Sequence, residues 1–510
     1  MHLPVEMIDN IVDCSIEPKR VSDISVQGSL PKDGRDDPWD VFISCDYNSH
    51  PYCGDEEDDH RTDRGFAYRS LEHVYNLRLV SATWNSSVIR ILRQYGWRPV
   101  NFNKTNSLEE VLELCKRKPE RKPGSIDNPL KDNIFNRLLI PTIGGVRSFT
   151  RWYDVNRARV EGRDLLGIYK DTMDERTRHY SQASDMSVGN RLVRDLMNNL
   201  TCVEAFSVAF EDAHSHKDEF RGGTYEADCY DVDLLDMAMD TILYGLRSPA
   251  FQHLFDLRLR LPGTRDIGRL AAGIPDNVKR QLKHLYLEVV DETGPGGKFY
   301  PLPFGDYAGS GNEDPHQDGA QTSIEHSAYA PSNLQAQYPN RDHQNEIWAF
   351  IESCNNLESL GLHCTHYLSL DRLNWKPGPK SRGLRALYLN RVYANAQTLI
   401  NLLTARDCEE TRDSVARRVD FTAVRIYRDG GDWSTVFSWL SDACPRLEFL
   451  HAKNLTYFST HEHFCPTCVN DMGDREIWTQ NFADEATLRD ARYDLAKKAG
   501  RLSHYPELDL

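Results

Sequence analysis

Long apolar stretches are missing from this chain of 510 residues. No run of about 18 apolar residues occurs, which excludes a transmembrane helix. The opening residues Met1–Glu6 lack the basic and apolar regions of a secretory signal. Cysteine is also scarce, because its 12 copies are far fewer than a disulfide-stabilised scaffold needs. We therefore expect a water-soluble protein of a reducing compartment, in the cytoplasm, the nucleus or both.

Positive charge is in short supply as well. The 61 Lys and Arg residues face 77 Asp and Glu residues, which gives a formal net charge of −16. Such a chain is poorly suited to neutralising phosphate groups. We expect neither nucleic acid nor a membrane surface as its partner.

Two segments have too few apolar residues to build a core. Residues 17–69 hold 13 Asp and Glu against 7 Lys and Arg, including the run Asp55–Asp59, and are called the acidic insertion below. Residues 303–346, the polar insertion, contain Ile324 and Leu334 as their only aliphatic β- or γ-branched residues. Burial in such segments cannot offset the entropy lost on ordering. Both are predicted to be disordered.

The remaining chain contains a repeated pattern in which Leu or another apolar residue occupies the first, fourth and sixth positions. The spacings between copies from Leu254 onward are 28, 75, 27, 37 and 26 residues, and the polar insertion lies within the 75. The segment Val146–Phe149 is a possible first copy. The copies are Val203/Phe206/Val208, Leu254/Leu257/Leu259, Leu282/Leu285/Leu287, Leu357/Leu360/Leu362, Leu384/Leu387/Leu389, Phe421/Val424/Ile426 and Leu447/Leu450/Ala452.

This pattern predicts a short strand in each copy, with the fourth and sixth positions on one face. A helix between strands adds its own apolar stripe, as in Leu399, Leu402 and Leu403. One such unit cannot cover its apolar face alone, so stacking of neighbours would form a continuous core. The alternative is an ordinary α/β domain with buried strands. In the solenoid the residue between the last two anchors would face outward, which makes six residues candidates for binding a target protein: Arg258, Tyr286, Gly361, Tyr388, Arg425 and His451.

The pattern resembles degenerate leucine-rich repeats of the longer, helix-containing kind. It departs from that family because the Asn or Cys expected three residues after the third anchor is absent, as at Val290, Thr365 and Val392. The resemblance implies an α/β fold with an irregular leucine-rich-repeat solenoid, one strand and one helix per repeat, over residues 98–302 and 347–470. Residues 471–510 are expected to form a C-terminal capping helix and tail.

Two N-terminal pieces carry a second pattern. Leu3-Pro4-Val5-Glu6 opens an apolar helix face, and Arg78-Leu79-Val80-Ser81-Ala82-Thr83-Trp84 comes after the acidic insertion. They could simply form a small helical subdomain. In this order, however, they resemble the two halves of an F-box, split here into residues 1–16 and 70–97 by roughly fifty residues, a loop whose closure costs little.

The F-box resemblance implies a substrate-recognition subunit of a Skp–cullin–F-box ubiquitin ligase. Such a subunit is not an enzyme and needs no cofactor. Its partners would be a Skp-type adaptor within the cullin complex and an unknown target protein. A repeat-based interaction scaffold without a ligase role is the alternative. The residues implied in adaptor binding are Leu3, Pro4, Ile8, Ile11, Leu79, Val80 and Trp84.

Motifs for catalysis are missing from the chain: it has no hydrolase nucleophile elbow, no Walker A loop and no His-Glu-x-x-His zinc helix. The densest set of metal-ligand residue types is His461, His463, Cys465 and Cys468. A Cys-x-x-Cys pair can hold one side of a tetrahedral zinc ion, but no second pair follows at the spacing of a zinc finger. We expect a surface turn here, with zinc binding as the alternative.

Overall fold

A computed structural model gives the fold of the protein. The residues it describes are 98–99, 105–116, 137–143, 147–151, 167, 170–171, 182–210, 226–289, 333–338, 340–405, 414–422, 424–427, 430–447, 449–453, 455–458, 470–471, 477–478 and 482–498.

The main element is an open parallel sheet of 11 strands whose members are neighbours almost in chain order: β1-β2-β4-β6-β7-β8-β9-β10-β12, with β11 between β9 and β13. Each pairing within it is parallel, as is typical of strands joined by crossover helices. The strands are β1 (Arg98–Pro99), β2 (Arg137–Ile143), β4 (Ala205–Phe210), β6 (Asp256–Leu261), β7 (His284–Val289), β8 (Ser359–Ser369), β9 (Ala386–Ala394), β10 (Arg418–Thr422), β11 (Arg425–Tyr427), β12 (Phe449–Lys453) and β13 (Thr456–Phe458).

The predicted apolar anchors are aligned across this sheet. Leu257, Leu285, Leu360 and Leu387 are successive register partners, and the residues two positions later form a second aligned row. These anchors are fully buried. Alternate residues of a strand point to opposite faces, so both rows face the same side.

The predicted position of the repeat at Phe421 is wrong. The register partners of Leu387 and Leu389 are Val419 and Phe421 of β10, so the anchors of this repeat are Ala416, Val419 and Phe421, and the repeat begins five residues before Phe421. Val424 and Ile426 lie in or beside β11, a second strand that pairs with the end of β9. Val146–Phe149 also does not start the series, because Arg147–Arg151 (β3) pairs antiparallel with β5 (Glu226–Tyr230) in a separate sheet.

The later repeats contain two strand segments each, because the strands bend. The register of β8 against β9 shifts between His363 and Leu368. Arg391 of β9 has a φ of 57°, a left-handed conformation that few non-glycine residues adopt, and its guanidinium donates a hydrogen bond to the Cys364 carbonyl at 3.0 Å. Beyond the bend, the end of β9, β11 and β13 continue as parallel neighbours.

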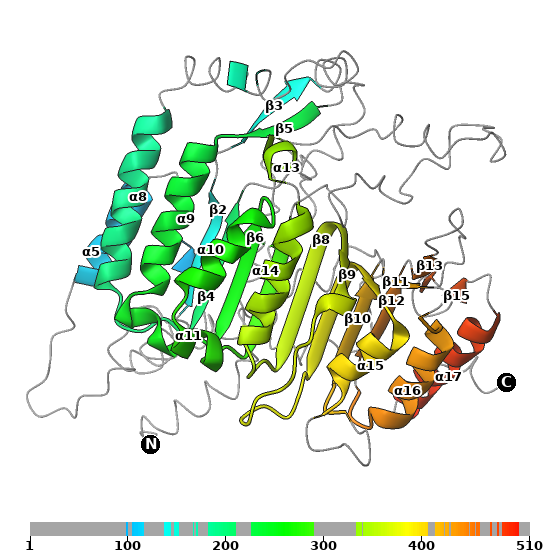
Figure 1. Ribbon diagram of the computed structural model, residues 1–510. Coiled ribbons are helices and arrows are strands. Elements are labelled where there is room, and N and C mark those ends of the chain that lie inside the picture. The colour runs from blue at the N-terminus through cyan, green and yellow to red at the C-terminus, as the bar shows by residue number, and fades with distance from the viewer. Residues whose placement is uncertain are drawn as a thin grey trace, which may run out of the picture.

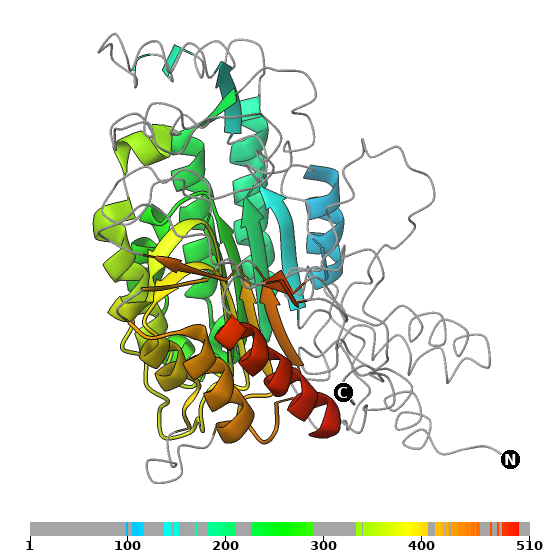
Figure 2. The ribbon, with the colours of Figure 1, turned by 90° about the vertical axis from the view of Figure 1, so that its right-hand side faces the viewer.

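Helices cover one face of the sheet. In Figure 1, α8, α9, α10, α14, α15 and α16 lie side by side over the strands, and Figure 2 shows this layer from the side. The α-helices are α5 (Thr105–Lys116), α8 (Gln182–Asn199), α9 (Val232–Leu246), α10 (Arg265–Gly273), α11 (Asp276–Gln281), α13 (Asn333–Gln337), α14 (Asn340–Ser353), α15 (Ala396–Leu403), α16 (Trp433–Ala443) and α17 (Phe482–Lys498), and the 3₁₀ helices are η2 (Pro249–His253) and η5 (Leu370–Arg372).

One continuous core joins the helical layer to the sheet, from Leu108 of α5 to Ala491 of α17. At its ends, α5 packs on α8 and α17 packs on α16. A two-stranded antiparallel sheet, β14 (Asn470–Asp471) and β15 (Ile477–Trp478), precedes α17. The predicted α/β class is therefore confirmed. Within the described ranges, no helix is both long and apolar enough to cross a membrane.

The predicted disorder of residues 303–346 is wrong at its C-terminal end. Helix α13 and the first half of α14 lie inside this range. Leu334 and Gln344 are buried, and the Asn333 side chain exchanges two hydrogen bonds of 2.7 Å with the backbone of Tyr230. The acidic insertion and residues 303–332 lie outside the described residues.

Candidate functional site: the polar face of the sheet

The face of the sheet opposite the leucine anchors carries polar residues. Across seven strands, the position between the two buried anchors forms a single row of register partners, called the central row here. The central row consists of Ser207, Arg258, Tyr286, Gly361, Tyr388, Asp420 and His451. Five of the six predicted target-binding residues lie in it.

Arg425 does not belong to the central row. It lies in β11, beyond the bend, with its guanidinium 5.9 Å from the ring centre of Tyr393. The central-row position of this repeat is Asp420, which the incorrect alignment of the repeat concealed. The signal was present in the sequence, since Arg418 to Thr422 alternate polar and apolar residues around Val419 and Phe421.

The expectation that the central row points into solvent is also wrong. Tyr286 and Tyr388 are each 1% exposed, Arg258 is 9% exposed and Gly361 is buried, whereas the His451 side chain keeps 25% exposure. Alternation along a strand tells which residues share a face, but it does not tell whether that face is covered. Burial of polar residues on this scale needs hydrogen-bonding or charged partners.

Charged pairs supply such partners at the β6 and β7 end of the face. The Arg258 guanidinium binds both carboxylate oxygens of Asp256, with Nε–Oδ1 at 3.0 Å and Nη2–Oδ2 at 2.8 Å. Arg260 contacts Glu288 of the next strand at 2.6 Å, and His363 Nδ1 lies 3.7 Å from the same carboxylate. Paired charges of this kind can be buried where isolated ones cannot.

His284 occupies the edge of the same face. Its Nδ1 lies 3.0 Å from the Ser359 hydroxyl. Burial lowers the pKa of the His284 imidazole, and the nearby carboxylate of Asp256 opposes this only partly. The neutral form of His284 is therefore favoured in the folded protein.

A second polar cluster lies where β9, β10 and β12 are adjacent. Asp420 is fully buried, and its Oδ1 is 3.1 Å from His451 Nδ1 and accepts a hydrogen bond of 3.1 Å from the Thr422 hydroxyl. Burial raises the pKa of the Tyr388 hydroxyl. The nearby charge of Arg418 lowers this pKa, and that of Asp420 raises it. A carboxylate held against Nδ1 fixes the orientation of an imidazole, so this cluster can present the second ring nitrogen of His451 in one direction.

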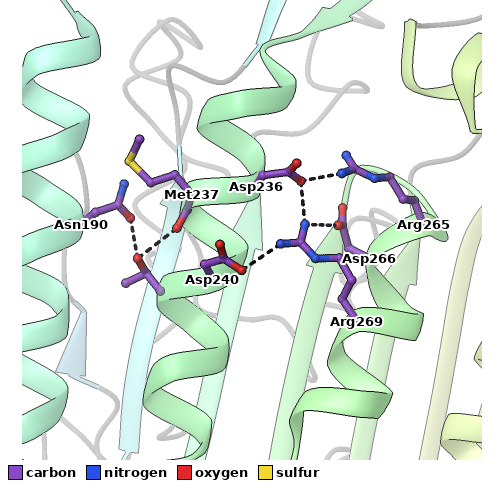
Figure 3. Close-up of polar contacts among 8 residues, drawn as sticks. Asn190, Asp236, Met237, Asp240, Arg265, Asp266 and Arg269 are labelled. Atoms are coloured by element: carbon purple, nitrogen blue, oxygen red, sulfur yellow. Dashed lines mark hydrogen bonds and ion pairs between the residues drawn. The ribbon is translucent and has the colours of Figure 1, made fainter.

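The helical face carries a separate network of charges (Figure 3). Arg269 of α10 contacts Asp236 at 2.6 Å and Asp240 at 2.9 Å, both on α9, and Arg265 also contacts Asp236 at 2.6 Å. Burial raises the pKa of the Asp266 carboxyl despite the adjacent Arg265 and Arg269. These groups form ion pairs with one another between two successive helices. We therefore assign the network to the packing of α9 on α10.

Several predicted site residues cannot be placed. The F-box residues Leu3 to Trp84 and the metal candidates His461, His463, Cys465 and Cys468 lie outside the described residues. Within the part of the chain that the structure describes, no group of three or more His, Cys, Asp and Glu residues is arranged to hold a metal ion.

Comparison with known proteins finds no match: no protein-family model fits the chain, and no curated protein matches its sequence.

Proposed function

We propose that the protein is the substrate-recognition subunit of a Skp–cullin–F-box ubiquitin ligase. In this proposal the split F-box binds a Skp-type adaptor and the rest of the chain is an irregular leucine-rich-repeat solenoid that binds a target protein. The observation that supports the repeat part of the proposal is the pairing of parallel strands almost in chain order, with apolar anchors in register. Stacked repeats produce this pattern.

The corrected spacing of the repeats also supports a solenoid. Leu254 and Leu282 are 28 residues apart, Leu357 and Leu384 are 27 apart, and the following anchors are Ala416 and Leu447, 32 and 31 residues further on. The spacing is therefore more even than the sequence pattern alone indicated. Both longer repeats contain strand residues beyond the bend, at the end of β9 and in β11.

A recognition subunit of this kind has no need of catalytic residues. It holds the target close to a ubiquitin-loaded enzyme, and the rate gain comes from effective concentration and orientation. The polar face would then serve recognition through its orienting groups, such as the Asp420–His451 pair at the more exposed end of the central row.

Adaptor binding tests the F-box directly. The double variant Leu3→Ala/Pro4→Ala should lose co-purification of a Skp-type adaptor, because truncation of apolar residues at the centre of an interface often costs about 2 kcal/mol or more. The chain offers a matched control, since Leu30 and Pro31 form the same dipeptide within the acidic insertion. Leu30→Ala/Pro31→Ala should bind normally. Full adaptor binding by the Leu3/Pro4 variant would refute the F-box assignment.

The alternative function is a repeat scaffold without ligase activity. The same sheet and anchors support it equally, so only the N-terminal segment separates the two. A wild-type chain that binds no Skp-type adaptor, while remaining folded, would favour the scaffold. Zinc in the purified protein by elemental analysis would instead favour a metal site at His461–Cys468.

A further inference from the structure

A cluster of positive charge lies on the edge of the sheet where the strands begin. The residues just before β7, β8, β9 and β10 are linked by a backbone ladder: the Glu358 N–H donates to the Lys283 carbonyl at 2.7 Å, Arg385 to Glu358 at 2.7 Å, and Arg417 to Arg385 at 2.8 Å. Lys283 and Arg385 extend from this ladder with side chains 53% and 58% exposed. Their backbones are therefore fixed while their charges face solvent.

The loops around this ladder bring further cations to the same edge. Gly378 donates its N–H to the Asn355 carbonyl at 2.6 Å, and the Asn356 side chain donates to the carbonyl of Arg280 at the end of α11. Figure 1 shows these loops together along the lower end of the strands. Strands β7 and β9 are two positions apart in the sheet, or about 10 Å. We call this surface the basic edge; it comprises Arg280, Lys283, Lys376, Lys380, Arg382 and Arg385.

The basic edge keeps most of its positive charge. Two carboxylates lie in residues 276–283, 355–358 and 373–385: Asp276, which pairs with Lys279 at 2.8 Å, and Glu358, which contacts Lys283 at 3.0 Å and Arg385 at 3.3 Å. Burial raises the pKa of Glu358, but the hydrogen bond from Lys283 and the charge of Arg385 outweigh it and hold that pKa below its usual value. A third carboxylate, Glu352, accepts a hydrogen bond of 2.7 Å from the Asn374 N–H beside this surface, so six cations face three anions in a chain of net charge −16.

We propose that the basic edge binds an acidic segment of a protein partner. An extended peptide rises about 3.3 Å per residue, so three or four residues span the distance from β7 to β9. Carboxylates on such a segment could each meet a guanidinium or ammonium group. This surface is distinct from the polar face and from the F-box, and the proposal holds whether or not the ligase assignment does.

Charge and composition favour a short acidic peptide over nucleic acid. Duplex DNA carries one charge per about 1.7 Å and extends well beyond a patch of this size, where it would meet a strongly acidic molecule. Single strands are usually held by stacking on exposed aromatic rings. Among the described residues, the exposed large hydrophobic side chain is Tyr244 of α9, which is in none of these loops.

The test uses charge reversal with a matched control. Lys376→Glu/Lys380→Glu/Arg382→Glu reverses three exposed cations of the basic edge. Arg191→Glu/Arg194→Glu/Arg372→Glu reverses three exposed cations on α8 and η5 and changes the net charge equally. Fluorescence anisotropy would measure binding of full-length protein to a labelled Glu-rich peptide, to the same peptide with Gln for Glu, and to a duplex oligonucleotide.

The wild type and the α8/η5 variant should bind the Glu-rich peptide with affinities within about twofold, and neither should bind the Gln peptide. The basic-edge variant should bind about tenfold or more weakly, because each exposed pair contributes a factor of roughly two to five. Raising salt from about 50 to about 200 mM should weaken wild-type binding. If the reversal variant unfolds, Lys376→Gln/Lys380→Gln/Arg382→Gln replaces it. Equal losses in both variants, absence of peptide binding, or tighter binding of the duplex would overturn the proposal.

Discussion

The carboxylate of Asp484, near the start of α17, accepts a hydrogen bond of 2.9 Å from the backbone N–H of Ser434, the second residue of α16. Its other oxygen accepts a hydrogen bond of 2.7 Å from the Tyr457 hydroxyl, which in turn accepts the N–H of Trp433 at 3.0 Å. Asp432 caps the next N–H of the same helix from its own side chain. The N–H groups at the beginning of α16 have no carbonyl partner within the helix and are thus satisfied partly by a residue some fifty positions later. Helix α17 is attached to the last repeat by these bonds.

Replacement of Asp484 should therefore loosen α17. Asp484→Ala leaves the Ser434 N–H and the Tyr457 hydroxyl without their acceptor in a buried site, which should lower the free energy of unfolding by about 2–3 kcal/mol. Asp490→Ala, at an exposed position of the same helix, should change it by no more than about 0.5 kcal/mol. Chemical denaturation of both variants measures the difference. Equal stabilities would show that Asp484 does not anchor the helix.

Removal of α17 as a whole should have a larger effect. A chain ending at residue 474 lacks Leu488 and Ala491, which are 0% and 1% exposed, and uncovers the face of α16 on which they pack. Burial of Leu488 alone contributes roughly 1.5–3 kcal/mol. The truncated protein should melt at a lower temperature and aggregate, since a terminal repeat without its cap exposes apolar surface. A chain ending at residue 500 retains α17 and serves as the control. If both chains melt alike, the last repeat caps itself.

Stability should decline in mild acid partly through His284. Its pKa is lowered in the folded protein below the ordinary value of 6.5, so below about pH 6.5 the unfolded chain binds a proton that the folded one does not. Stability from this residue is present above that pH and is lost as the pH falls toward the folded pKa. His284→Gln should make the loss of stability between about pH 7 and pH 5 smaller, by less than 1.4 kcal/mol per pH unit. His253→Gln, at an exposed position, is the matched control for the substitution itself. Denaturation midpoints across this pH range would measure both.

Much of the sheet could be predicted from the sequence because its signal is periodic and local. The anchors from Leu254 to Leu389 are in register as predicted, and the apolar stripe Leu399, Leu402 and Leu403 is buried in α15. Near-constant spacing makes such a repeat visible without any knowledge of its contacts.

The failures come from features that periodicity does not encode. One repeat contains two strand segments, β10 and β11, and both alternate apolar and polar residues. The sequence pattern therefore placed the anchor at Val424 instead of Val419. The sequence pattern predicts a polar face in solvent, whereas Asp256 pairs with Arg258, and Glu288 with Arg260, in a largely buried layer. Charge pairing across neighbouring strands depends on register, which the sequence of one strand does not contain.

The polar insertion shows the same limit and leads to the last prediction. Composition alone places residues 333–346 in it, yet Asn333 binds the backbone of Tyr230 from 103 residues away, and Gln344 accepts a hydrogen bond of 3.2 Å from the Ser369 N–H.

Deletion of residues 303–330 should leave the melting temperature within about 2 °C of the wild type, because polar insertions in connecting segments change the closure entropy only slightly. Deletion of residues 303–346 removes both bonds, the buried Leu334 and the first half of α14, and should lower the melting temperature by about 5 °C or more. Two deletions that share a start and differ by 16 residues thus separate a dispensable segment from a structural one. Equal melting temperatures for the two deletions would mean that α13 and the start of α14 contribute nothing to the stability of the fold.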